Sequence, residues 1–352
     1  MEAGTTCSEG AKRRVPEYDI IKGISILLVS IIHTGHPVYF MEYGFLFAFF
    51  FVSGCTFKYR GIGTFLKSKL LRIYIPFVLA NLAGWFVGRL YYGLSGYGGY
   101  GYSLKEAVGR ALSFQIAENL MSPTWFLLPL FLVSCLYYFL YRVLMKVKYR
   151  DEILLGGAFI IFLLALYFRQ ALSVVVYNRC SVISTSVYAL FFYALGYYYH
   201  NHRELSRKII SGKYSAEVFV LGILLLNEIW NHSDYTLNVR YGEMSSGWLT
   251  VPVSVLGVFV IVYLAGCMTR MPLFEKVFCL LGRHSLAIML FHVISYGAVT
   301  IMLHYVMNWD YPVTWAFGYY SEKISYLNAL AGVLIPVAAA EGWQRIKLNV
   351  LK

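Results

Sequence analysis

Long apolar segments recur along almost the whole chain, and the polar stretches between them are too short to form a separate domain. A helix needs about 20 mostly apolar residues to cross a hydrocarbon core roughly 30 Å thick. Only 14% of the residues are charged, whereas soluble domains carry about a quarter. Because lipid offers no partners to the backbone, spanning helices satisfy their own hydrogen bonds. We therefore predict an all-α, polytopic transmembrane bundle of about ten spans, over residues 18–34, 39–57, 72–92, 123–142, 153–168, 182–199, 215–231, 247–268, 284–306 and 325–344.

The 30 Lys and Arg residues are distributed unevenly between the two sides of this bundle. About 22 of them fall on the side that holds both termini, and about 7 fall on the other side. Membrane proteins concentrate Lys and Arg in cytoplasmic loops, so both termini are predicted to be cytoplasmic. The asymmetry also explains the net charge of +12 without a nucleic-acid partner. We expect tails at 1–14, where no apolar segment suggests a signal peptide, and at 346–352, around one membrane domain at 15–345.

The outer connection between the third and fourth predicted spans starts with a Gly- and Tyr-rich stretch. Ser103 and Glu106 then match a capping box, which predicts the start of a short helix at this point. This helix is either a connector or a lid over the acceptor side.

The first predicted span carries two ionisable side chains on nearly the same face. Lys22 and His33 are eleven residues apart, so about 16 Å separates them along a helix axis. Ionisable groups inside spans are rare, and they usually face a cavity or a partner. We therefore expect His33 to serve catalysis or transport near mid-depth. Lys22, near the inner face, is expected either to pair with Asp19 or to bind an anion.

A second histidine, His292, lies within the ninth predicted span. It follows Arg283, which marks the inner boundary, at a depth of roughly 13 Å. Two histidines at similar depth predict a shared polar cavity, although a single interhelical hydrogen bond would also explain His292. His33 and His36 could together ligate a metal, but no carboxylate or third histidine accompanies this pair locally, so no metal site is expected.

Lys67, Lys69 and Arg72 form a basic cluster where the third predicted span begins. The cluster either follows from topology alone or neutralises phosphates of a cytosolic ligand. Trp125 at the outer interface and the acidic Glu228 are weaker candidates. The sequence has no HxxxxD, GxSxG or P-loop pattern. These absences argue against a glycerolipid acyltransferase of the HxxxxD type, a serine hydrolase and a P-loop ATPase.

Five short motifs follow one another along the chain. They are Lys22 with His33 after ten intervening residues, an FxSG motif at 51–54, a basic-to-proline segment at 72–76, Trp125 in the fourth span, and the segment from Leu281 to His292. Together they resemble the acyltransferase family 3, the integral-membrane O-acyltransferases, over residues 14–345. The chain looks closest to the fucose 4-O-acetylase-like branch.

This resemblance implies an enzyme of the cell (plasma or inner) membrane. It would transfer an acyl group, expected to be acetyl, from cytosolic acyl-CoA to a hydroxyl of an envelope carbohydrate or lipid-linked acceptor. Acyl-CoA would be a co-substrate, and no bound cofactor is expected. The candidate residues are His33 as the catalytic base, His292 as a second catalytic group, Lys22, Lys67, Lys69 and Arg72 for the donor phosphates, and Ser53, Trp125 and Glu228 for substrate.

Two departures from the family pattern are visible. Lys22 stands where many members have Arg, and no Glu follows Trp125 as it does in the longer O-antigen branch. The alternative function is a proton-coupled transporter or exporter, in which His33 and His292 would relay protons.

Overall fold

The computed structural model describes residues 14–95, 101–173, 177, 180–308 and 322–350. These residues are mainly helical, and the all-α prediction is confirmed apart from one small hairpin, in which Leu237 pairs with Met244. The elements are α1 (Pro16–Ile32), η1 (Tyr39–Tyr43), α2 (Phe45–Cys55), α3 (Ile62–Lys69), η2 (Leu70–Tyr74), α4 (Ile75–Ser95), α5 (Leu104–Leu112), η3 (Asn119–Phe126), α6 (Leu127–Val143), α7 (Arg150–Tyr167), α8 (Arg169–Ser173), α9 (Val182–Asn201), α10 (Arg203–Ser211), α11 (Ser215–His232), β1 (Leu237–Asn238), β2 (Glu243–Met244), α12 (Gly247–Met268), α13 (Pro272–Arg283), α14 (Ser285–Met307) and α15 (Glu322–Val350).

Every predicted span overlaps one of these helices. Within the described part of the chain, five helical segments are long and apolar enough to cross a membrane, namely Ile62–Leu94, Asn119–Val143, Gly247–Met268, Ser285–Val306 and Ile324–Lys347. Helix α2 is apolar apart from Ser53 but has only 11 residues. The chain is therefore a multi-pass membrane protein, whereas the number of about ten spans and the cytoplasmic termini stay predictions.

Several helices lie where the sequence suggested only connections. Helix α3 continues through the π-helical η2 into α4, so the predicted span at 72–92 is the second part of a longer rod. Helix α13 begins with Pro272 at its first position, where proline costs no backbone hydrogen bond. Both α3 and α13 are short and charged, so neither contains an apolar run long enough to predict a span.

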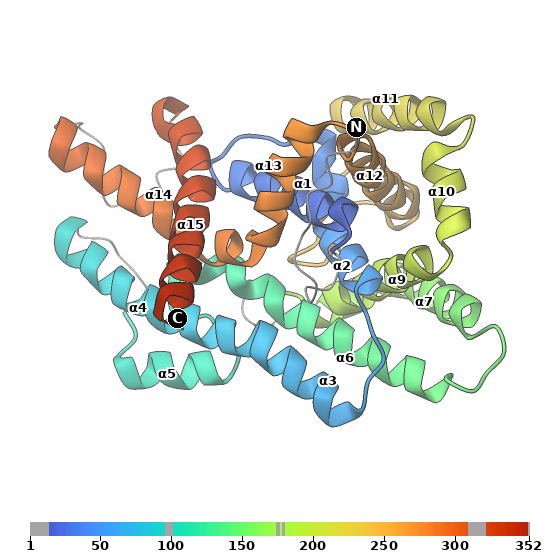
Figure 1. Cartoon of the computed structure of the whole chain (residues 1–352), viewed down its shortest axis with the longest axis horizontal. Helices are drawn as coiled ribbons and strands as arrows, with labels where there is room; N and C mark the ends of the chain where they lie inside the picture. The colour runs from blue at the N-terminus through green and yellow to red at the C-terminus, as the bar shows by residue number, and fades with distance from the viewer. Residues whose placement is uncertain (1–13, 96–100, 174–176, 178–179, 309–321, 351–352) are drawn as a thin grey trace.

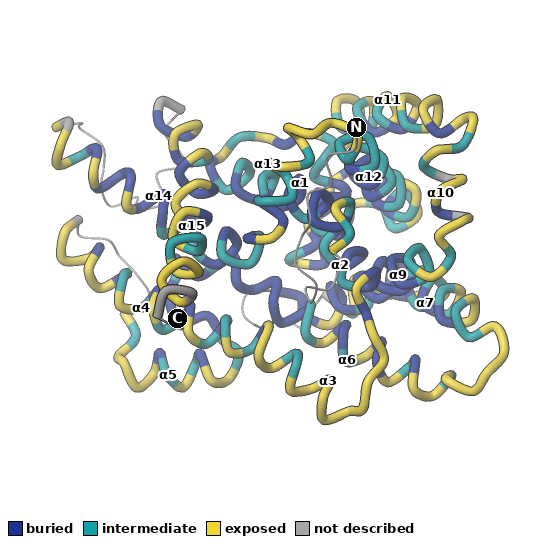
Figure 2. The backbone as a smooth tube through the Cα atoms, viewed as in Figure 1, coloured by how far each residue is buried: buried dark blue, intermediate teal, exposed yellow. Residues whose placement is uncertain are grey.

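Helices α1 and α2 lie near the middle of the molecule, while α14 and α10 lie toward opposite edges (Figure 1). Helices α2 and α9 are buried along most of their length, whereas much of α3, α5 and α10 is exposed (Figure 2). The first two predicted spans therefore belong to the core of the bundle.

Glycine brings α1 and α13 into backbone contact. A Cβ added to Gly23 would lie 2.2 Å from the Phe278 carbonyl oxygen, and one added to Gly282 would lie 1.7 Å from the Asp19 carbonyl oxygen. Helices in lipid pack mainly by close van der Waals contact, for which small residues are favoured. The glycine in the segment from Leu281 to His292 thus seats α13 on the first turns of α1.

The same device joins α2 to α9. A Cβ on Gly54 would lie 1.9 Å from the Tyr193 carbonyl oxygen, and one on Gly196 would lie 1.8 Å from the Phe51 carbonyl oxygen. The FxSG glycine therefore has a packing role, and it fixes the position of the α2 face that carries Ser53.

The predicted capping box and the end of the first predicted span can be compared with the structure. The capping box at the start of α5 is confirmed, since Ser103 N donates to Glu106 Oε2 at 2.8 Å and Glu106 N donates to Ser103 Oγ at 3.3 Å. The bonds that Ser103 N and Ser103 Oγ donate to the carboxylate hold the pKa of Glu106 below its usual value. Helix α1 ends at Ile32, and His33 caps it; Gly35 then adopts a φ of +83°, which glycine favours.

Candidate active site

A cavity of about 220 Å³ lies beside the C-terminal end of α1, and we call it the histidine cavity. Its wall comes from α1, η1, α2, η3, the β1 segment and α14. Two of the predicted site residues, His33 and Trp125, line it, as do two residues that the sequence analysis missed, Glu42 and Arg240. Most of the remaining wall is apolar, so the few polar groups are concentrated around one space.

One hydrogen bond fixes the tautomer of the neutral His33 ring. The Nδ1 atom lies 2.7 Å from the carbonyl oxygen of Val29, four residues earlier in α1. A carbonyl oxygen can only accept, so the neutral ring carries its proton on Nδ1. This leaves Nε2 with a free lone pair on a half-buried side chain at the cavity wall, which is what a general base requires.

His292 does not line the histidine cavity, and its ring packs against that of His33. The ring centroids are 5.1 Å apart, and the rings meet edge to face at 63°. His292 Nδ1 lies 2.8 Å from the Ile288 carbonyl oxygen, so this ring has the same tautomer. Its Nε2 is buried and has no hydrogen-bond partner among the described residues. A lone buried acceptor costs about 1–3 kcal/mol, which calls for an explanation.

A tyrosine holds this part of α14 against α1. Tyr296 donates to the Ser30 carbonyl oxygen at 2.7 Å, and its hydroxyl also lies 2.8 Å from Ser30 Oγ. Its ring centroid is 5.6 Å from that of His292. The two histidines therefore belong to a rigid α1–α14 contact.

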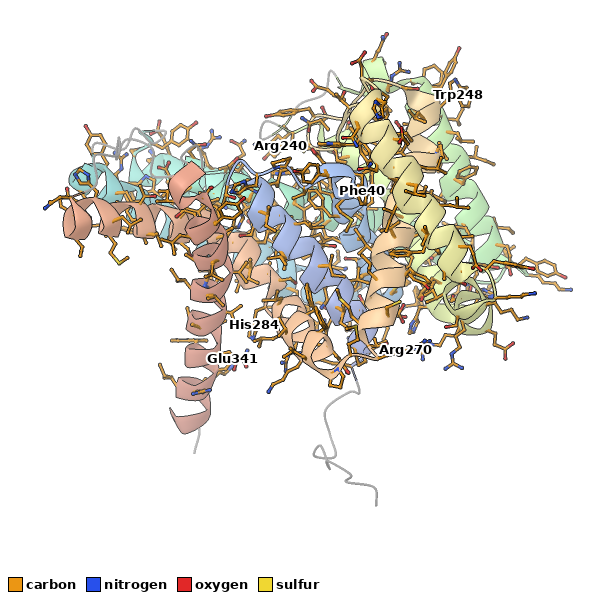
Figure 3. The ribbon with its side chains drawn as sticks, turned by 90° about the horizontal axis from the view of Figure 1, so that it is seen from above. Phe40, Arg240, Trp248, Arg270, His284 and Glu341 are labelled. Atoms are coloured by element: carbon orange, nitrogen blue, oxygen red, sulfur yellow. The ribbon has the colours of Figure 1, made fainter. Side chains whose placement is uncertain are left out.

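Arg240 and Trp125 form the polar and aromatic part of the wall. The Arg240 guanidinium lies 5.9 Å from the Trp125 ring centroid and donates to Ser122 Oγ at 3.1 Å. Arg240 lies near Phe40 at one end of the bundle, opposite the end that holds Arg270 (Figure 3).

The signal for Arg240 in the sequence was its position as the one basic residue between 232 and 246. The signal for Glu42 was a carboxylate in an otherwise apolar segment.

A second cavity, of about 350 Å³, is lined by four cations, and we call it the cationic cavity. Lys69 and Arg72 come from the predicted basic cluster, while Lys58 and Arg60 come from the segment after α2. Lys69 Nζ donates to Ser134 Oγ at 3.0 Å. The predicted substrate residue Ser53 also lines this cavity, away from His33, and donates to the Phe49 carbonyl oxygen at 2.8 Å.

The other two predicted donor contacts lie elsewhere. Lys22 Nζ forms an ion pair with Asp19 Oδ1 at 2.6 Å, and its side chain is 28% exposed. Lys67 is exposed on α3. Neither residue lines the cationic cavity. The structure thus places two of the four predicted donor contacts at the cavity and two outside it.

Glu228 does not approach the histidine cavity. Its side chain is 68% exposed on α11 and lies 3.6 Å from His232 Nε2. Another acidic residue, Glu341 on α15, lies 2.6 Å from His284 Nε2 at the end of the bundle opposite Arg240 (Figure 3). This pair joins α15 to the start of α14. Glu228 and Glu341 therefore each pair with a histidine, and neither lines the histidine cavity.

Comparison with known proteins identifies one family. The model of the family Acyl_transf_3, described as an acyltransferase domain, matches residues 15–335. No curated protein and no solved structure gives a significant match. The matched region contains both histidines and the helices that frame the two cavities. The chain therefore belongs to the acyltransferase 3 family and is an enzyme that transfers acyl groups.

Proposed function

We propose that this enzyme is an O-acyltransferase of the plasma membrane. It would move an acetyl group from cytosolic acetyl-CoA to a hydroxyl of a cell-envelope carbohydrate or lipid-linked acceptor. The observation that carries the proposal is the free Nε2 of His33 in a cavity that shares a helix, α2, with a cation-lined cavity. The alternative of a proton-coupled transporter has no comparable support, because the family match is to acyltransferases.

The donor would bind from the side of the cationic cavity. Lys58, Arg60, Lys69 and Arg72 bring four positive charges to one space, and charge-assisted bonds to phosphate are about twice as strong as neutral ones. This assignment modifies the expectation for Lys22, whose charge is already balanced by Asp19. The phosphates of coenzyme A would occupy the cationic cavity, with the thioester directed along α2 toward His33.

The chemistry follows from the tautomer of His33. Nε2 accepts the proton of the acceptor hydroxyl while the hydroxyl oxygen attacks the thioester carbonyl carbon. The carbon–oxygen bond forms, the carbon–sulfur bond breaks, and coenzyme A leaves as a thiolate. The proton on Nε2 then passes to the thiolate sulfur, which restores the base. Positioned general bases contribute about 10²–10⁴-fold to such steps.

His292 would support the charge that develops on His33. When Nε2 of His33 takes the proton, the ring becomes a cation in an apolar wall, where an unpaired charge is costly. The His292 ring packs against that of His33, and its Nε2 lone pair, which has no partner among the described residues, would offset part of this charge while the proton stays on His33 until it passes to the thiolate. This role makes His292 a positioning residue, since it does not line the histidine cavity.

The acceptor would enter the histidine cavity from the opposite end. Trp125 offers an aromatic face, while Arg240 and Glu42 offer a donor and an acceptor for hydroxyl groups. Aromatic faces beside polar groups suit sugars, which have both apolar and hydroxyl-bearing surfaces. The resemblance to fucose 4-O-acetylase-like proteins also favours a carbohydrate. Glu228 has no geometric support as an acceptor contact.

Labelled acetyl-CoA tests this function directly. Membranes containing the parent enzyme or His33→Gln are incubated with acetyl-labelled donor, and the envelope fractions are then separated. Label in a carbohydrate fraction with the parent alone is the expected result. Equal labelling by both proteins would exclude His33 as the base. Substrate movement driven by a pH gradient, without any transfer of label, would favour the transporter instead.

A further inference from the structure

The two cavities lie one after the other along the same pair of walls. On α2, Phe49 lines the histidine cavity, and Ser53, one turn later, lines the cationic cavity. On the opposite rod, formed by η3 and α6, Phe126 lines the first cavity and Leu130, one turn later, lines the second. Helices α2 and α6 both pack against α9. Both cavities are therefore lined by α2 on one side and by the continuous η3–α6 rod on the other.

Two aromatic rings of the histidine cavity wall lie one helical turn before the residues that line the cationic cavity. The ring centroids of Phe49 and Phe126 are 5.6 Å apart, with a 59° angle between the planes. Phe126 is 5% exposed and also packs on Phe50, with centroids 4.7 Å apart. Phe49 is less buried than Phe126, so it has more freedom to change rotamer. Phe126 is thus the more fixed of the two rings and Phe49 the more movable.

We infer that Phe49 and Phe126 form the constriction that admits the thioester end of the donor and selects the size of its acyl group. The inference rests on the proposed function for the identity of the donor, but the constriction itself depends only on geometry. Two apolar rings also keep water of the cationic cavity away from His33. Excluding water protects a reactive thioester from hydrolysis. A smaller side chain at either position widens the passage.

Access across the constriction can be measured without any catalysis. Leu46 lines the histidine cavity, so Leu46→Cys is placed in a chain whose six native cysteines are replaced by alanine. A charged thiol reagent is added to membrane vesicles on the side of the cationic cavity. Phe49→Ala and Phe126→Leu are expected to accelerate labelling of this cysteine. Phe47→Leu is the matched control, because Phe47 stacks on Phe192 and lines neither cavity.

The acyl preference is the second readout. Transfer from acetyl-, propionyl- and butyryl-CoA is compared for the parent, Phe49→Ala, Phe126→Leu and Phe47→Leu. The ratio of longer to shorter acyl transfer should rise on the order of tenfold per methylene in the two constriction variants. It should stay at the parent value in Phe47→Leu.

The outcomes separate the proposed constriction at Phe49 and Phe126 from the proposed use of acyl-CoA as the donor. Unchanged labelling of Leu46→Cys in both constriction variants would overturn the constriction. Faster labelling with an unchanged acyl preference would overturn its role in size selection. Faster labelling in a protein that never transfers an acyl group from coenzyme A would leave the constriction in place and overturn the proposed donor.

Discussion

His33 and His292 meet edge to face with ring centroids 5.1 Å apart. Each ring uses Nδ1 to bond a carbonyl oxygen four residues earlier in its own helix, so each presents Nε2 as its free nitrogen. Only His33 lines the cavity, and His292 is fully buried. The pair therefore divides into one residue that can reach substrate and one that can only act through the first.

Replacing His33 with glutamine should remove the base without removing the fold. Gln keeps a polar side chain of similar reach, so the cavity wall persists. Acyl transfer should fall about 10²–10⁴-fold, while binding of acyl-CoA survives. Single-turnover transfer and donor binding are measured on the same preparation. His36→Gln is the matched control, because His36 bonds Ser325 Oγ at 2.7 Å and lies outside the histidine cavity. Near-normal transfer by His33→Gln would contradict general-base catalysis by this residue.

Replacing His292 with phenylalanine separates support of charge from packing. The substitution keeps a planar ring and removes the buried acceptor that has no partner among the described residues. Burial of such an acceptor costs about 1–3 kcal/mol, so the thermal stability of the protein should stay equal or rise. Activity should nevertheless fall on the order of tenfold, with the loss in kcat rather than in KM. Full activity in a stable His292→Phe protein would mean that the residue only fills space.

The glycine contact between α1 and α13 should be intolerant of even one methyl group. Ala at position 282 would bring its Cβ to within 1.7 Å of the Asp19 carbonyl oxygen, and overpacking of this kind costs about 1–3 kcal/mol. Gly156→Ala in α7 is the matched control, since its Cβ would meet nothing within 4 Å. We expect a lower melting temperature in detergent for Gly282→Ala alone. Equal melting temperatures of the two variants would show that α1 and α13 can move apart without loss of stability.

The proximity of the two histidines could be predicted from the sequence, and the direction in which each side chain faces could not. Counting from the inner boundary put His33 and His292 at similar depth, and the structure brings their rings together. The same counting grouped Lys22 with Lys69, although Lys22 pairs with Asp19 and Lys69 lines a cavity. Counting residues gives a position along the axis of a helix, whereas the facing direction depends on contacts with other helices.

Residues in connecting segments were the hardest to assign. Arg240 follows the β1 strand, and Glu42 lies in the short helix η1. Neither lies in an α-helix whose hydrophobic period would orient it, so the sequence could not predict that both reach the histidine cavity. The capping box at Ser103, in contrast, depends on two residues three positions apart. Local hydrogen-bond chemistry was therefore predictable where the shape of the assembled cavity was not.

The cationic cavity provides a charge-matched test of donor binding. Lys67 and Lys69 are two residues apart on α3, but only Lys69 lines the cavity, and Lys67 is exposed. Replacing Lys69 with glutamine should weaken acyl-CoA binding about tenfold or more, because a charge-assisted hydrogen bond contributes about 1.5–3 kcal/mol. Lys67→Gln removes the same charge and should leave the affinity within about twofold at physiological ionic strength, where exposed charges are screened. Titration of purified protein with a non-hydrolysable acyl-CoA analogue measures both. Equal losses in the two variants would mean that the donor senses only the net positive charge of this face, and the cationic cavity would then not be its binding site.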